Sequence, residues 1–167
     1  LFFDIALQDL NQAARLLRPV HDASRGQDGW VSIEVSPLLA NDISATVMAA
    51  VELYSYARQL NLFIKIPATP AGLSAIEEVV FKGVPVNVTL LFSPHQYLAA
   101  ANAYLTAIER RIAVDLDPNA SSVASLFVSR WDVAVNGQLP AELRNRLGMA
   151  IAKKTYSVYR ALLASPR

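Results

Sequence analysis

Apolar and polar positions along this chain alternate between short runs typical of strands and longer stretches with helical spacing. Residues 3–18 carry apolar side chains three or four positions apart, which predicts a first helix that Pro19 ends. The buried side of this helix would comprise Phe3, Leu7, Leu10, Ala14 and Leu17. Four runs rich in β-branched and aromatic residues predict strands at 30–35, 62–66, 84–92 and 122–128.

Each predicted strand is followed by a predicted helix. Capping residues and first-turn prolines indicate where these helices begin. The expected starts are Asp42, Thr69-Pro70, Ser93 in a capping box with Gln96, and about Ala141 after the loop that contains Asn136-Gly137. The order is therefore one helix and then four strand–helix pairs.

Strands that alternate with helices predict an α/β protein with parallel strands and helical crossovers. An open doubly wound sheet and part of a (β/α)₈ barrel both fit this order. A complete barrel has eight strands and about 200–250 residues. With 167 residues and four predicted strands, the chain is too short to be a complete barrel.

Composition excludes several classes of protein. A hydrophobic share of 53% and a charged share of 17% are opposite to those of a disordered chain. The net charge of +1 argues against a nucleic-acid binder, and the absence of cysteine excludes disulfides and thiolate chemistry. No apolar run approaches the roughly 18 residues of a membrane span, and no basic leader opens the chain, so a cytoplasmic location is expected. The missing initiator Met suggests an interior piece of a longer chain.

Charged side chains interrupt the first two predicted strands. Glu34 lies in Val31–Val35, and its simplest interpretation is a solvent-facing carboxylate at a strand end. Lys65 lies between two isoleucines. An amine in apolar surroundings loses its proton more easily and becomes a nucleophile toward carbonyls. A lysine at the edge of the sheet, with its amine reaching solvent, is an equally good interpretation.

Polar side chains also interrupt the last two predicted strands. Asn87 and Thr89 are two residues apart and should share one strand face, opposite Val86, Val88 and Leu90. Ser125 and Phe127 repeat this spacing in the fourth strand. Arg130 follows that strand, where it could bind a phosphate or pair with Asp132. All these residues are near the C-terminal halves of their strands, where ligands bind in both α/β architectures.

Other candidate chemistries find little support. The chain has no GxGxxG, P-loop, GxSxG or HExxH motif. The two histidines, His21 and His95, lie far apart in the sequence, so they are expected to be surface or capping residues and not metal ligands.

Four segments resemble the transaldolase family. Ile64-Lys65-Ile66-Pro67-Ala68-Thr69 is similar to its Schiff-base lysine motif, and Asn87-Val88-Thr89-Leu90-Leu91-Phe92-Ser93 to the strand that follows. Val31–Val35 resembles the glutamate strand, and Ala124–Arg130 the phosphate-site strand. The resemblance implies that residues 1–167 are a single incomplete domain, strands three to six of a permuted (β/α)₈ barrel.

The resemblance also implies an activity. Transaldolases move a dihydroxyacetone unit from sedoheptulose 7-phosphate to glyceraldehyde 3-phosphate in the pentose phosphate pathway, without metal or organic cofactor. Lys65 would form the imine, and Glu34 and Thr89 would assist proton transfer through a water molecule. Asn87 and Ser125 would bind substrate hydroxyls, Phe127 would shape the pocket, and Arg130 would bind the phosphate.

The family's acid/base Asp and its seventh strand find no match in this chain, so the chain is expected to be inactive alone and to self-associate through open barrel edges. Two other functions stay open. One is a non-catalytic α/β module that binds a sugar phosphate or a partner chain. The other is an enzyme like fructose-6-phosphate aldolase, which would orient its water with a tyrosine where this chain has Glu34.

Overall fold

A computed structural model describes residues 2–167, with side chains from residue 5 onward. The expected burial of Phe3 lies outside the described side chains. The helices are α1 (Phe2–Ala23), α2 (Ile43–Ala57), α3 (Pro70–Phe81), α4 (Pro94–Ala113), α5 (Ser129–Val135) and α6 (Leu147–Leu163), with short 3₁₀ turns η1 (Pro37–Leu39), η2 (Asn136–Gln138) and η3 (Ala141–Leu143). The strands are β1 (Val31–Glu34), β2 (Leu62–Pro67), β3 (Val86–Leu91) and β4 (Ser122–Leu126).

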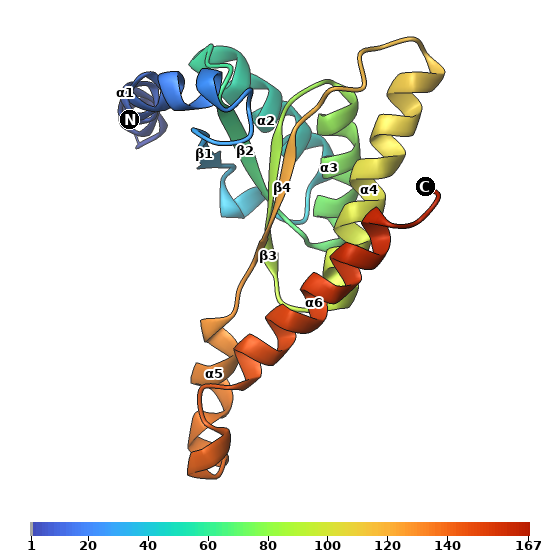
Figure 1. Ribbon diagram of the computed structural model, residues 1–167. Coiled ribbons are helices and arrows are strands. Elements are labelled where there is room, and N and C mark those ends of the chain that lie inside the picture. Colours follow the sequence, from blue (N-terminus) through green and yellow to red (C-terminus); the bar gives the residue numbers. More distant parts are fainter. Residues whose placement is uncertain (1) are drawn as a thin grey trace.

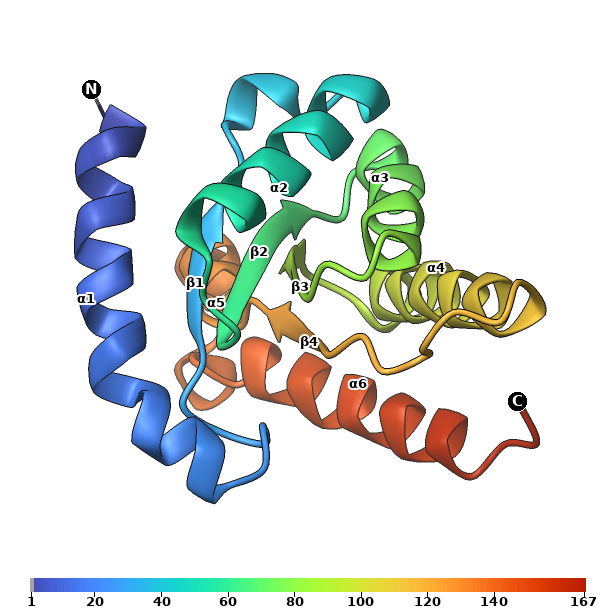
Figure 2. The same ribbon diagram turned by 90° about the horizontal axis from the view of Figure 1, so that it is seen from above.

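The four strands form one parallel sheet in the order β1-β2-β3-β4. Helices α2, α3 and α4 cover one face of this sheet, and α1 lies beside β1 (Figure 1, Figure 2). In the described part of the chain, β1 and β4 each pair with one strand only, so both are edges. The predicted α/β class is confirmed, and helices on one face of a curved parallel sheet are the arrangement of part of a (β/α)₈ barrel.

Alternate strand positions build the core beneath the helices. Ile33, Ile64, Ile66, Val86 and Val88 are all less than 10% exposed and pack in one cluster with α2, α3 and α4. The residues between them in the strands point to the opposite, inner face. This alternation separates an apolar outer face from an inner face that carries the polar candidates.

The predicted helix starts are confirmed for three of the four later helices. Oxygens of the Asp42, Thr69 and Ser93 side chains accept hydrogen bonds from backbone N–H groups in the first turns of α2, α3 and α4, at 2.9, 2.9 and 3.2 Å. The capping box differs in one bond, because the Gln96 amide oxygen accepts from the Phe92 N–H, one residue before the cap.

Two helix boundaries differ from the prediction. Pro19 does not end α1, which continues to Ala23. Pro19 is exposed, so water can solvate the Arg15 carbonyl that loses its usual N–H partner. The last helix begins at Leu147, not near Ala141, and a further helix, α5, occupies part of the predicted loop.

Asp132 of α5 explains the late start of α6. Its carboxylate accepts from the backbone N–H groups of Leu147 and Gly148, at 3.0 and 3.2 Å, and so caps α6 from another helix. A carboxylate at this end also interacts favourably with the helix dipole. No local sequence pattern around Ala141 contains this tertiary contact.

The outer face of β4 is only partly covered. An apolar cavity of about 680 Å³ separates it from α4 and α6, with Tyr97, Leu126 and Leu162 among its lining residues. At the far end of α4, the Tyr104 hydroxyl donates to the Ala120 carbonyl oxygen just before β4, and burial raises the pKa of this phenol. Within the described residues, no helix is both long and apolar enough to cross a membrane.

Gly72 should tolerate no side chain. A Cβ at this position of α3 would collide with the carbonyl oxygen of Pro67, which is backbone and cannot move aside. We expect Gly72→Ala to lower the free energy of unfolding by about 1–3 kcal/mol, measured by urea denaturation. Gly137→Ala is the matched control, because a Cβ there meets nothing within 4 Å, and its unfolding free energy should stay within about 0.5 kcal/mol of the unsubstituted protein. Equal effects of the two substitutions would contradict this packing.

Candidate active site

Aromatic rings lie near the starts of β1 and β2, on the inner face of the sheet. The Trp30 ring stacks on the Phe63 ring with centroids 4.1 Å apart, and His21 packs edge-on against Trp30 at 4.8 Å. The polar residues of the inner face follow these rings along the strands. These polar residues therefore lie toward the C-terminal ends of the strands.

Glu34 and Lys65 form an ion pair on this inner face. They are register partners in β1 and β2, and the Lys65 ammonium nitrogen lies 3.1 Å from Glu34 Oε2. The Lys65 side chain is 27% exposed and that of Glu34 42%. Since β2 lies between two strands, the edge-lysine interpretation is wrong. Nor is the amine fully buried, because it has both a charged partner and access to solvent.

Asn87 is the centre of a hydrogen-bonded chain that crosses the sheet. It is the register partner of Lys65 in β3. The Ser125 hydroxyl of β4 donates to Asn87 Oδ1 at 2.7 Å, and Asn87 Nδ2 donates to the Ser32 hydroxyl of β1 at 3.3 Å. The bond to Ser32 spans the width of β2, which the curvature of the sheet permits (Figure 2). Ser32 was not among the predicted site residues, although its period-two spacing with Glu34 is a signal for the same face.

A β-bulge in β3 changes the predicted alternation. Thr89 and Leu90 together oppose the single residue Ser125 of β4, and Leu90 has a left-handed φ of +58°. This conformation costs a leucine about 1–2 kcal/mol. Leu90 was expected on the outer face beside Val88, and that prediction is wrong. Leu91, fully buried in the core cluster, takes the outer position, because the bulge adds one residue to β3.

Thr89 is almost fully buried beside the bulge. The residue is 1% exposed, and its hydroxyl makes no hydrogen bond with any of the described residues. Buried hydroxyls normally have a partner. A buried hydroxyl without a partner is therefore unusual, and it distinguishes Thr89 from the other polar residues of the strands.

Arg130 lies against two aromatic rings. Its guanidinium carbon is 5.0 Å from the Phe127 ring centre and 5.9 Å from that of Phe92, and these rings are 5.4 Å apart. The alternative of an ion pair with Asp132 is not supported, because the described residues form no such pair and the Asp132 carboxylate caps α6. Phe92 was not among the predicted site residues, because its place on the inner side depends on the bulge.

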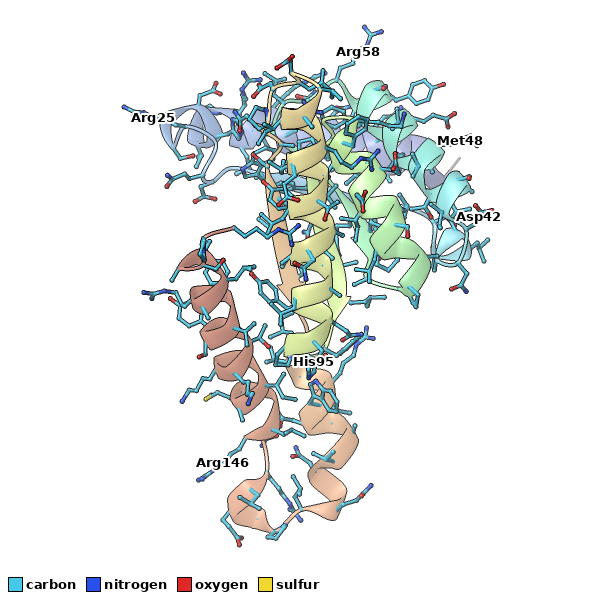
Figure 3. The ribbon with its side chains drawn as sticks, turned by 90° about the vertical axis from the view of Figure 1, so that its right-hand side faces the viewer. Arg25, Asp42, Met48, Arg58, His95 and Arg146 are labelled. Atoms are coloured by element: carbon cyan, nitrogen blue, oxygen red, sulfur yellow. The ribbon has the colours of Figure 1, made fainter. Side chains whose placement is uncertain are left out.

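The histidines lie apart from these groups. His95 is exposed in the first turn of α4 (Figure 3), and His21 packs on Trp30. In the described part of the chain, no three His, Asp or Glu side chains are grouped so as to hold a metal ion.

Glu34, Lys65 and Asn87 form one row across three strands. Ser125 forms a hydrogen bond with Asn87, and Thr89 lies two residues beyond Asn87 in β3. Phe127 and Arg130 form a second group past the end of β4. The C-terminal ends of the strands thus carry an amine, a carboxylate, hydroxyl and amide groups, and a guanidinium. This set can bind and activate a carbonyl compound that carries hydroxyl groups and an anionic group.

Comparison with known proteins agrees with this arrangement. The family model described as "Transaldolase/Fructose-6-phosphate aldolase" matches residues 1–165. A transaldolase of Parafrankia sp. is 42% identical over 98% of this chain, and transaldolase 2 of Nostoc sp. is 37% identical over 99%. A transaldolase of Mycobacterium bovis is 43% identical over 93% of the chain. The chain spans 46%, 48% and 44% of the lengths of these relatives, so under half of each. The match over nearly all of its residues, with the lysine, glutamate and asparagine side by side on the inner face, means that the chain belongs to the transaldolase/fructose-6-phosphate aldolase family.

Proposed function

We propose that this chain supplies the imine-forming lysine and the sugar-phosphate contacts of a transaldolase. The whole enzyme would move a dihydroxyacetone unit from sedoheptulose 7-phosphate to glyceraldehyde 3-phosphate. The observation that carries the proposal is the row of Glu34, Lys65 and Asn87 on adjacent strands, with the Lys65 nitrogen 3.1 Å from a carboxylate oxygen.

The reaction begins at Lys65. Its neutral amine attacks the ketose carbonyl carbon, a C–N bond forms, and the carbonyl oxygen leaves as water to give an imine. Cleavage of the carbon–carbon bond then sends its electron pair into the imine, and an aldehyde departs. Addition of the remaining dihydroxyacetone unit to the acceptor aldehyde and hydrolysis of the new imine return the free amine.

Glu34 is the base nearest to this amine. Its Oε2 is within hydrogen-bond reach of the Lys65 nitrogen and can take the ammonium proton before attack. The Thr89 hydroxyl has no partner among the described residues, and we propose that it holds the water through which protons move during imine formation and hydrolysis. Because this hydroxyl is buried, the side chains around it would have to move for the water to enter.

The remaining candidates bind the substrate. Asn87 and Ser125 form a hydrogen bond with each other, which fixes the orientation of both side chains. Their remaining donor and acceptor sites would bind sugar hydroxyls. Arg130 would bind the phosphate through its N–H groups, beside the Phe127 ring. No step in this sequence requires a metal or an organic cofactor.

The carboxylate that would assist carbon–carbon cleavage has no counterpart in these 167 residues by resemblance to the family. We therefore expect the chain alone to form imines without turning over the transferase reaction. The competing function is a non-catalytic module that binds a sugar phosphate or a partner chain, with Lys65 as an anion contact. Trapping of the imine separates the two.

Borohydride should fix a dihydroxyacetone unit on Lys65. With dihydroxyacetone and borohydride we expect one added unit by intact mass, mapped to Lys65 by peptide analysis. Lys65→Arg should abolish the adduct, because a guanidinium does not form an imine under these conditions. Lys82→Arg, a change at an exposed lysine after α3, should leave adduct formation unchanged. Equal modification of the Lys65→Arg variant would instead support the non-catalytic module.

Glu34 should control the rate of this trapping. Removing the carboxylate from beside the amine in Glu34→Gln should slow adduct formation by about a hundredfold, the scale of a general base. Glu52→Gln, at an exposed carboxylate of α2, is the matched control and should not slow it. The time course of adduct mass reports both rates. An undiminished rate in Glu34→Gln would remove Glu34 from the mechanism.

The open edges β1 and β4 should make the chain self-associate. Each edge has backbone N–H and C=O groups with no neighbouring strand in the described part of the chain. We expect the elution volume in size-exclusion chromatography to fall, or its light-scattering mass to rise, as the loading concentration increases. A constant monomer mass from dilute to concentrated loading would contradict this.

A further inference from the structure

Phe92 lies where β3 ends, and the bulge determines which way it faces. If Leu90 occupied a regular strand position and β3 had no bulge, alternation would direct Leu91 to the inner side and Phe92 outward. Instead Leu91 is buried in the core, and the Phe92 ring contacts Phe127 and Arg130. The bulge at Leu90, with its left-handed φ, thus places the Phe92 ring beside Arg130.

Both backbone groups of Phe92 are held by side chains. Its N–H donates to Gln96 Oε1 at 2.8 Å, and its carbonyl oxygen accepts from the indole N–H of Trp131 at 2.8 Å. Trp131 follows Arg130 directly in α5. The bond from Trp131 therefore fixes the start of α5 relative to the end of β3, and with it the position of Arg130.

The Arg130 guanidinium contacts two aromatic rings, and its N–H groups have no partner among the described residues. The centres of Phe92 and Phe127 lie 5.9 and 5.0 Å from its carbon, within the range of cation–π attraction. Its N–H groups make no hydrogen bond or ion pair with other described residues. Contact with a ring face leaves the in-plane N–H groups of a guanidinium available for two bonds to a phosphate.

A second stack in the molecule provides the contrast. Arg110 lies 4.3 Å from the Phe81 ring, yet its Nη1 also bonds Glu77 and Glu78 at 2.7 and 2.6 Å. That guanidinium is committed to carboxylates of α3. Arg130 has the same kind of aromatic support without an anionic partner among the described residues.

We propose that Phe92 is a positioning residue that holds the Arg130 guanidinium ready for the phosphate of a phosphorylated ketose. It makes the site favour phosphorylated over unphosphorylated donors, and it acts through Arg130, without touching the reacting carbon. This assignment rests on the proposed function for the sugar, but the phosphate contact itself can be tested without it.

Inorganic phosphate is the first probe, followed through the Nε–H resonance of Arg130, which Arg130→Lys identifies. We expect Phe92→Leu to raise the dissociation constant for phosphate about three- to tenfold, the range of one cation–π contact. Phe92→Tyr retains the ring and should bind like the unsubstituted protein. Phe81→Leu, which removes the other stack, should also leave phosphate binding unchanged.

The second arm compares two ketoses in borohydride trapping. Phe92→Leu should raise the half-saturating concentration of fructose 6-phosphate by a similar factor and leave trapping of dihydroxyacetone unchanged. A merely structural role would weaken both. Should Phe92→Leu fail to fold, the ring-current shift of the Arg130 Nε–H in the unsubstituted protein and in Phe92→Tyr still tests the stack.

The outcomes separate the two proposals. Phosphate binding that is unaltered in Phe92→Leu, or absent in the unsubstituted protein, overturns the role of Phe92. Weakened phosphate binding in Phe92→Leu, together with no ketose adduct in any variant, supports the role of Phe92 and overturns the imine chemistry of the proposed function.

Discussion

Burial of alternate strand positions beneath one layer of helices is the constraint on which the structure depends. Ile33, Ile64, Ile66, Val86 and Val88 are sealed from water by α2, α3 and α4. Since side chains alternate along a strand, the same burial directs Glu34, Lys65 and Asn87 to the other face. A register error of one residue would exchange these faces, so packing of the core and placement of the site are one physical requirement.

Parallel pairing in register then converts that face into a site. Glu34 and Asn87 are 53 residues apart along the chain. They nevertheless form one row with Lys65, because Lys65 is the register partner of Glu34 in β1 and of Asn87 in β3. Cross-strand bonds strengthen the row, with an ion pair at 3.1 Å and a hydrogen bond from Ser125 to Asn87 at 2.7 Å. The proposed imine chemistry uses this proximity of an amine, a base and an amide.

The end of the sheet near α5 is organised differently, by side chains that bond to backbone groups. Trp131 and Gln96 hold Phe92, and Asp132 caps α6. These contacts begin where the β3–β4 ladder is interrupted by the bulge at Leu90. α5 extends away from the sheet (Figure 1), so its attachment depends on these few bonds more than on a shared apolar core. Arg130 and its two aromatic rings, which form the proposed phosphate-binding site, lie in this region.

The sequence by itself determined the order of the strands and of every helix except α5, the three side-chain caps and the faces of β1 and β2, because periodicity and capping act over a few residues. It also identified Glu34, Lys65 and Asn87 as polar interruptions of apolar strands. Only the tertiary structure decided the ion pair of Lys65, the start of α6 at Leu147 under the cap of Asp132, and the inner position of Phe92. These depend on contacts between residues distant in sequence, and the bulge exists because β3 has one residue more than β4 between two paired positions. Local pattern contains no information on how many residues a neighbouring strand presents, which is why Leu90 was expected on the wrong face.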